Sequence, residues 1–275
     1  MPTDLFIYAN GDSFVEGAEL GDFLIHSYPG AYNFNEPYGE VKPHIKAWFD
    51  EIQTPGTELF ELRQHLTKQI KREQQQRNFC AKLAGMMKAE FYNNGLGGAG
   101  MDRILRTTLT DLIEFKKTKK KILAIIGTTE LLRMELPSSN DDSTLWEIYH
   151  PGNKISNSSV NSVLEYYYLR TKNYHKMVKF YQYVITLQDF CKANSIKLMW
   201  ISGYAPIDQI IQVETELIME KDLCALQDYA SFKYAADMQQ LAKIINYNVR
   251  LPGYHFSESV HDATAKQLYE QLDEL

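Results

Sequence analysis

The sequence predicts a three-layer α/β/α sandwich around a mostly parallel sheet. Short continuous apolar runs, typical of strands buried on both faces, recur along the chain. Long segments with helical periodicity separate these runs, and strands that alternate with helices form right-handed βαβ units. The 275 residues, 44% hydrophobic and 23% charged, are enough for one large domain with a sizeable core.

The expected elements follow in chain order. Four apolar runs are predicted to be strands: 5–9 (LFIYA), 89–93 (AEFYN), 121–127 (KILAIIG) and 196–202 (IKLMWIS). Four segments are predicted to be helical: 57–89, 102–115, 162–194 and 261–275. Two stretches, 20–56 and 137–160, are expected to be elaborated loops that shape a site. Because no repeat or linker divides the sequence, we expect a single domain over residues 1–275.

Composition narrows the class of protein. The formal net charge of -6 disfavours a nucleic-acid binder, which normally carries a basic excess. No apolar run has the length of a membrane helix, and no secretory signal is visible, so we expect a cytoplasmic protein. Three scattered cysteines (Cys80, Cys191, Cys224) are expected to be buried free thiols. Without a Cys/His cluster, neither a metal nor a cofactor is expected.

Polar residues follow each predicted strand. Ligands of open parallel sheets bind beyond the carboxyl ends of the strands. The first strand is followed by Asp12 and Ser13, the second by the glycine-rich segment 93–104, the third by Thr129, and a C-terminal loop holds His255. Acyl transfer requires a nucleophile, a base and donors to an oxyanion, and this inventory fits that chemistry.

Each of these residues also has a simpler interpretation. Ser13 could be a helix N-cap, with Glu16 completing a capping box. The glycines at 95–100 do not have the G-x-G-x-x-G spacing, so a dinucleotide cofactor is not expected. Arg133 and Glu135 are expected to form a structural ion pair. The sequence alone leaves the first choice, between cap and nucleophile, open.

Four blocks of the chain together resemble the SGNH/GDSL hydrolase superfamily. The blocks are NGDSFVEG (10–17), NNGLGGAGMDRIL (93–105), IIGTTELLRME (125–135) and GYHFSESVHDATAKQL (253–268). The second block is similar to that of phage-encoded members, which would place the protein in a host cytoplasm. The resemblance implies a flavodoxin-like sheet and hydrolysis of esters or acetyl groups on lipids, glycans or small molecules.

The resemblance also implies roles. Ser13 would be the nucleophile and its own N–H an oxyanion donor, Gly98 would give a second N–H, and His255 would be the general base. Thr129 stands where the family has an asparagine, and its hydroxyl would be the third oxyanion donor. Asp12 and Arg133 would support the site.

The sequence departs from the family at the third triad member. Pro252 stands three residues before His255, where the family has an aspartate. The resemblance therefore implies a Ser–His dyad or an incomplete triad in which another group orients His255. A backbone carbonyl, Glu258 or Asp208 are the candidates. His261 is expected to make a contact at the start of the last helix rather than to bind metal.

Three hypotheses follow. The first is a serine hydrolase, an esterase or an O- or N-deacetylase of an acylated glycan, lipid or small molecule. The second keeps the fold without the chemistry: a binding or assembly protein of phage origin on a weakened scaffold, motivated by Pro252 and Thr129. The third, phosphoester hydrolysis, lacks a metal cluster or an arginine clamp in the sequence. The substrate and the oligomeric state do not follow from the sequence.

Overall fold

The computed structural model describes residues 4–25, 43–131, 133–137, 146–149, 173–203, 221–245 and 255–272. The central sheet contains β1 (Leu5–Asn10), β2 (Glu90–Asn93), β3 (Lys121–Thr128), β6 (Lys197–Ser202) and β7 (Ala236–Asp237). Its strand order is β2-β1-β3-β6-β7, and every neighbouring pair is parallel. This is the flavodoxin-like order, so the predicted fold class is confirmed.

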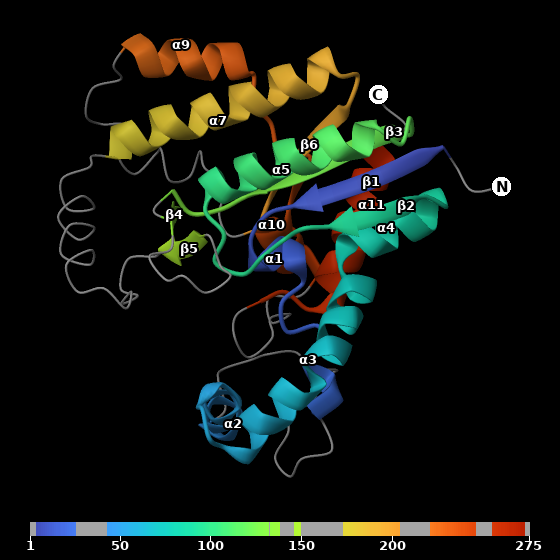
Figure 1. Ribbon diagram of the computed structural model, residues 1–275, viewed down its shortest axis with the longest axis vertical. Coiled ribbons are helices and arrows are strands. Elements are labelled where there is room, and N and C mark those ends of the chain that lie inside the picture. The colour runs from blue at the N-terminus through green and yellow to red at the C-terminus, as the bar shows by residue number, and fades with distance from the viewer. Residues whose placement is uncertain are drawn as a thin grey trace.

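Helices cover both faces of this sheet (Figure 1). One face carries α5 (Met101–Lys116), α7 (Asn173–Ala193) and α9 (Lys221–Ala230). The other carries α1 (Ser13–Glu16), α4 (Phe79–Met87), α10 (Met238–Ile245) and α11 (Glu258–Leu272). Along β1 the side chains alternate between the two layers, since Phe6 and Tyr8 face the first set and Ile7 and Ala9 the second.

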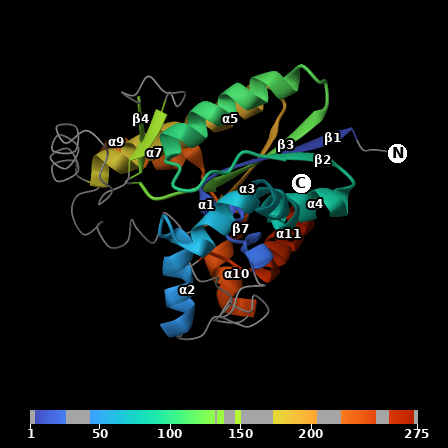
Figure 2. The same ribbon diagram turned by 60° about the horizontal axis from the view of Figure 1, so that its bottom comes forward.

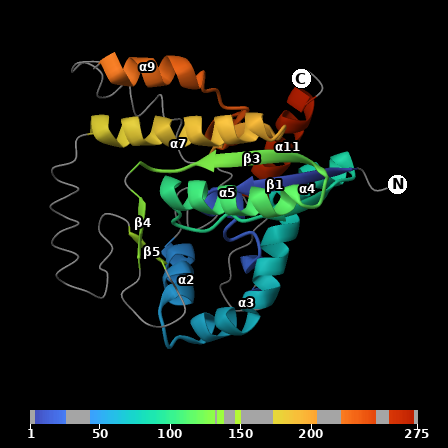
Figure 3. The ribbon, with the colours of Figure 1, turned by 45° about the horizontal axis from the view of Figure 1, so that its top comes forward.

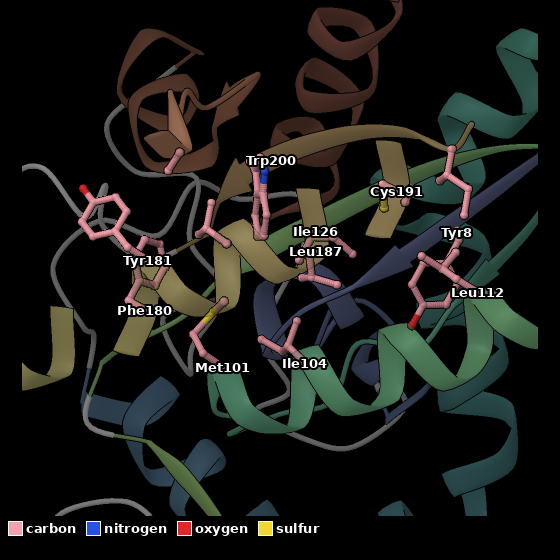
Figure 4. Packing of buried hydrophobic residues seen from close by; sticks show 14 of the residues in the cluster. Tyr8, Met101, Ile104, Leu112, Ile126, Phe180, Tyr181, Leu187, Cys191 and Trp200 are labelled. Carbon is pink, nitrogen blue, oxygen red and sulfur yellow. The ribbon is translucent and has the colours of Figure 1, made fainter. Parts of the chain in front are cut away.

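On the first face, side chains of α5 and α7 pack directly against the sheet. Figure 4 shows side chains of both helices meeting Tyr8, Ile126 and Trp200 of the sheet. In Figure 3, α9 lies along α7 on the side away from the sheet. Because these strands are buried on both faces, their sequences are continuously apolar, which is why the apolar runs identified them.

The predicted helix over 57–89 is two helices. The first, α3, covers Glu58–Arg77 and α4 begins at Phe79. Asn78 separates them: its backbone is extended (φ -74, ψ 164) and its side chain accepts a hydrogen bond from Ala81 N as the cap of α4. The segment 57–89 as a whole is rich in helix formers, so composition did not reveal the break.

The first expected excursion, 20–56, contains the 3-10 helix η1 (Asp22–Ile25) and α2 (Pro43–Gln53). With α3 these elements form a small apolar cluster of their own around Trp48 and Ile52. Figures 1 and 2 show α2 and the start of α3 extending away from the sheet. The second excursion, 137–160, lies mostly outside the described residues, but its described part includes the strand β5 (Trp146–Tyr149), which pairs antiparallel with β4 (Met134–Pro137).

The described residues bear on two expectations from composition, the state of the cysteines and the presence of membrane helices. Cys80 and Cys191 are buried free thiols, as expected, and burial raises the pKa of both. None of the helices in the described part of the chain is long and apolar enough to cross a membrane.

Candidate active site

Ser13 begins the one-turn helix α1, directly beyond the carboxyl end of β1 (Figure 1). Glycines at neighbouring strand ends allow α1 to lie this close to the sheet. A Cβ at Gly11 or Gly127 would meet Val15 Cγ2 at 2.3 or 2.2 Å, and one at Gly203 would meet Phe14 Cβ at 2.7 Å. The glycines therefore fix α1 against the ends of β1, β3 and β6.

Asp12, not Ser13, is the N-cap of α1. The Asp12 carboxylate accepts a hydrogen bond from Phe14 N at 3.1 Å. Glu16 does not complete a capping box, because its Oε2 accepts from Gly97 N at 2.8 Å. The capping interpretation of Ser13 is therefore wrong. The Ser13 side chain is 9% exposed and forms no hydrogen bond with another described residue.

Arg133 binds the buried carboxylate beneath Ser13. Its Nη1 lies 3.3 Å from Asp12 Oδ2 and donates to Thr129 Oγ1 at 3.1 Å. Burial raises the pKa of the fully buried Asp12 above its usual value, although Arg133 acts to lower it. The expected Arg133–Glu135 pair is absent, since Glu135 forms a bidentate pair with Arg106. Thr129 and Asp12 are thus joined through one guanidinium.

The glycine turn after β2 lies against α1. Asn93 Nδ2 donates to Val15 O at 2.7 Å, and a Cβ at Gly97 would lie 3.7 Å from Ser13 Cβ. Most amides of this turn already have acceptors: Gly95 N binds Asn93 Oδ1, Leu96 N binds Gly11 O, Gly97 N binds Glu16 Oε2 and Ala99 N binds Leu96 O. The exceptions are Gly98, whose φ is 79°, and Gly100, since neither N–H has an acceptor among the described residues.

His255 reaches the same edge of the sheet from the C-terminal part of the chain. Its ring centroid lies 5.3 Å from that of Phe14, the residue after Ser13. The charge of His255 also acts to lower the pKa of Asp12 and of Glu16, which burial raises. The structure shows no hydrogen bond between Ser13 and His255 among the described residues. Such bonds are often long in unliganded enzymes and tighten when substrate binds.

A carboxylate that the sequence did not reveal lies beside His255. Glu19 Oε1 is 3.4 Å from His255 Nδ1, and the two side chains are 7% and 22% exposed. Nδ1 is buried and forms no aligned hydrogen bond, so this contact is electrostatic in the present conformation. Nearby, Asp22 pairs with Arg63 at 3.4 Å, and burial raises the pKa of Asp22 to about 6.

Of the other candidates to orient His255, Glu258 is committed elsewhere. Its carboxylate binds Arg77 Nη1 at 2.8 Å and Lys82 Nζ at 2.7 Å. Asp208 and Pro252 lie outside the described residues. The carboxylate that the structure places beside the imidazole is therefore that of Glu19.

His261 has a structural contact at the start of α11. Its Nδ1 accepts a hydrogen bond from Phe79 N at 3.2 Å, which satisfies the first amide of α4. Its side chain is fully buried, and burial lowers its pKa to about 3. Among the described residues, no group of three His, Cys, Asp or Glu side chains is arranged to hold a metal ion.

No protein-family model and no curated protein matches the chain. Solved structures that it matches include G-D-S-L family proteins from Desulfitobacterium hafniense DCB-2 (12% identity, 96% of this chain and 98% of that one, TM-score 0.43) and Veillonella parvula DSM 2008 (12%, 98% and 100%, TM-score 0.42). An acetyl xylan esterase from the rumen bacterium Butyrivibrio proteoclasticus matches at 12% identity and a TM-score of 0.45, and the chain covers 64% of its length. Each of these three matches extends over at least 96% of this chain.

Proposed function

We propose that the protein is a serine hydrolase of the SGNH type, an esterase or an O- or N-deacetylase of an acylated glycan, lipid or small molecule. One observation carries the proposal: His255 packs against the turn that bears Ser13, with its ring beside Phe14 and its Nδ1 beside a buried carboxylate. A nucleophilic hydroxyl next to an imidazole that is itself oriented by an acid is the arrangement that acyl transfer requires.

In this proposal Ser13 Oγ attacks the acyl carbonyl while His255 accepts its proton. A tetrahedral oxyanion forms, and His255 then donates the proton to the leaving alcohol or amine as the bond to it breaks. Water attacks the resulting acyl-Ser13 ester by the same route, with His255 again as the base, and releases the acid and the free serine. The dyad ends in its starting protonation state.

The amides of Ser13 and Gly98 are the proposed oxyanion donors. The free N–H of Gly98 beside the turn supports this role, because the neighbouring amides of the segment already donate to other acceptors. Thr129 is the proposed third donor. Its oxygen accepts from Arg133 and its hydroxyl also interacts with the Asp12 carboxylate, so it would turn from Asp12 to donate to an oxyanion. Asp12 and Arg133 would hold Thr129 and the cap of α1 in place.

The experiment is active-site labelling with a fluorophosphonate probe, together with hydrolysis of an aryl acetate ester. We expect wild-type protein to be labelled on Ser13, located by mass spectrometry of peptides, and Ser13→Ala to lose both labelling and turnover. Acetylated glycans, lipids and small alcohols would then be compared as substrates. Absence of labelling and of turnover throughout the neutral pH range would reject the proposal and favour the binding or assembly alternative.

A further inference from the structure

The base of the proposed reaction needs an acceptor for its second ring nitrogen. A catalytic imidazole is usually held in one tautomer by a hydrogen bond from Nδ1–H to a carboxylate, which also stabilises the imidazolium. Pro252 occupies the position that supplies this carboxylate in the family, and its side chain has no acceptor atom. Another part of the chain must supply the group if the histidine is to be oriented.

We propose that Glu19 positions His255 and replaces the missing aspartate, so that nucleophile and acid come from the same short segment of the chain. Glu19 Oε1 lies 3.4 Å from Nδ1, which is otherwise without a hydrogen-bond partner. A rotation of the ring within its site would convert this contact into a hydrogen bond. The inference rests on the proposed function, because it assigns a role within that reaction.

The backbone of Glu19 is consistent with a functional constraint. Its φ is 69°, in the left-handed region that few residues other than glycine adopt, and its side chain is 7% exposed. A residue other than glycine is strained in this conformation, which persists only where the surroundings require it. Neither the conformation nor burial favours a glutamate at this position for stability alone.

Four other titratable groups lie around His255. Asp12, Glu16, Asp22 and His261 all interact electrostatically with it. Asp12 binds Phe14 N and Arg133, Glu16 binds Gly97 N, and Asp22 binds Arg63. His261 accepts from Phe79 N. Among the carboxylates near the imidazole, the one within reach of Nδ1 in the described structure is Glu19.

The position of Glu19 gives it a distinct mode of action. Because it contacts the far nitrogen of the imidazole, it would not touch substrate, so it is a positioning residue. With Nδ1–H directed to Glu19, the other ring nitrogen is left as the acceptor for the Ser13 proton, and the carboxylate stabilises the charge that the ring then carries.

The experiment compares Glu19→Gln, Glu19→Asp and the control Glu258→Gln, which makes the same chemical change three residues after His255. For the aryl acetate we expect Glu19→Gln to lower kcat by about 10²–10⁴-fold with little change in KM, and Glu19→Asp to recover part of this loss. We expect the acid limb of the pH–rate profile of Glu19→Gln to move to lower pH, because the imidazolium loses a neighbouring negative charge. Glu258→Gln should keep kcat within a few-fold of wild type.

The outcomes separate this inference from the proposed function. Inactive wild-type protein would reject the function itself. Active wild type with an equally active Glu19→Gln would leave the function standing and overturn the role of Glu19. Loss in Glu19→Gln with no recovery in Glu19→Asp and an unmoved acid limb would indicate a structural role and also overturn it. Thermal unfolding of each variant shows whether it is folded, and the Glu19→Asp comparison still tests the role if Glu19→Gln is not.

Discussion

His255 and His261 lie six residues apart but in different environments: His261 is buried between helices, and His255 lies at the carboxyl edge of the sheet among acidic side chains. His261, on the side of the sheet, is buried, accepts from Phe79 N and has its pKa lowered to about 3 by burial, so it is neutral. His255, at the carboxyl edge, is partly exposed and faces the carboxylate of Glu19. His261 holds α4 and α11 together, whereas His255 is partly exposed and surrounded by acids.

The carboxylates follow the same division. Burial works to raise the pKa of Glu258, but Lys82 and Arg77 outweigh it and hold that pKa below its usual value. At the carboxyl edge burial prevails, and the pKa values of Asp12, Glu16 and Asp22 are all raised. Ion pairs between α4 and α11 thus stabilise the fold, while the candidate site keeps acids buried at a cost in stability. Such perturbed groups cluster at functional sites.

Exchanging the two histidines for alanine is the strongest test of this contrast. We expect His255→Ala to lower kcat/KM for the aryl acetate by about 10³-fold or more with little loss of stability. We expect His261→Ala to lower the free energy of unfolding by about 2–4 kcal/mol, since it leaves a cavity and an unsatisfied amide, with activity retained by the folded protein. Equal losses of activity in both folded variants would remove the distinction.

Asp22 tests how much folding stability is lost by burying a carboxylate near the candidate site. Its pKa is raised from 3.8 to about 6 in the folded protein. The folded state therefore binds the proton more tightly between these values, and stability falls as pH rises through this window, by about 3 kcal/mol at most. In Asp22→Asn this fall should disappear. Denaturant unfolding of both proteins across the window gives the difference, and parallel curves would contradict the assignment.

Glu258, between α4 and α11, tests the opposite direction of the change in stability with pH. Because its folded-state pKa lies below its usual value of 4.5, its contribution is present above that pH and is lost as pH falls through the folded pKa. Its side chain is 40% exposed, so we expect Glu258→Gln to cost less than about 1 kcal/mol at neutral pH, and less at high salt. A loss of unfolding free energy in Glu258→Gln of about 3 kcal/mol, or a loss that does not change with salt, would show that solvent exposure does not weaken the ion pairs of Glu258.

The longer strands and helices were predictable because each of them has a local signal. The strands β1, β3 and β6 are continuously apolar because both faces are covered, and turn residues follow each of them. The break at Asn78 was not predictable, since it depends on a side chain that caps the next helix inside the fold. The two-residue strand β7 is too short to give any periodicity.

The candidate site was predictable only in part, for the same physical reason. Parallel strands deliver Ser13, the glycine turn and Thr129 to one edge, so their order along the chain indicated their meeting. Their chemical roles stay predictions. Glu19 follows no strand and matches no motif. Its place beside His255 arises from a left-handed turn and from tertiary packing, neither of which is visible in residue types alone.

The three glycines under α1 have a consequence for protein engineering. Gly11, Gly127 and Gly203 set the height of the turn above the sheet, because the Val15 and Phe14 side chains of α1 lie directly against them. Segments that join the elements and carry no candidate site residue can therefore be shortened, lengthened or randomised in a search for new substrates while the Ser13 hydroxyl keeps its position. A library that left these three codons unchanged and varied the connecting segments would retain more functional members than one that varied both.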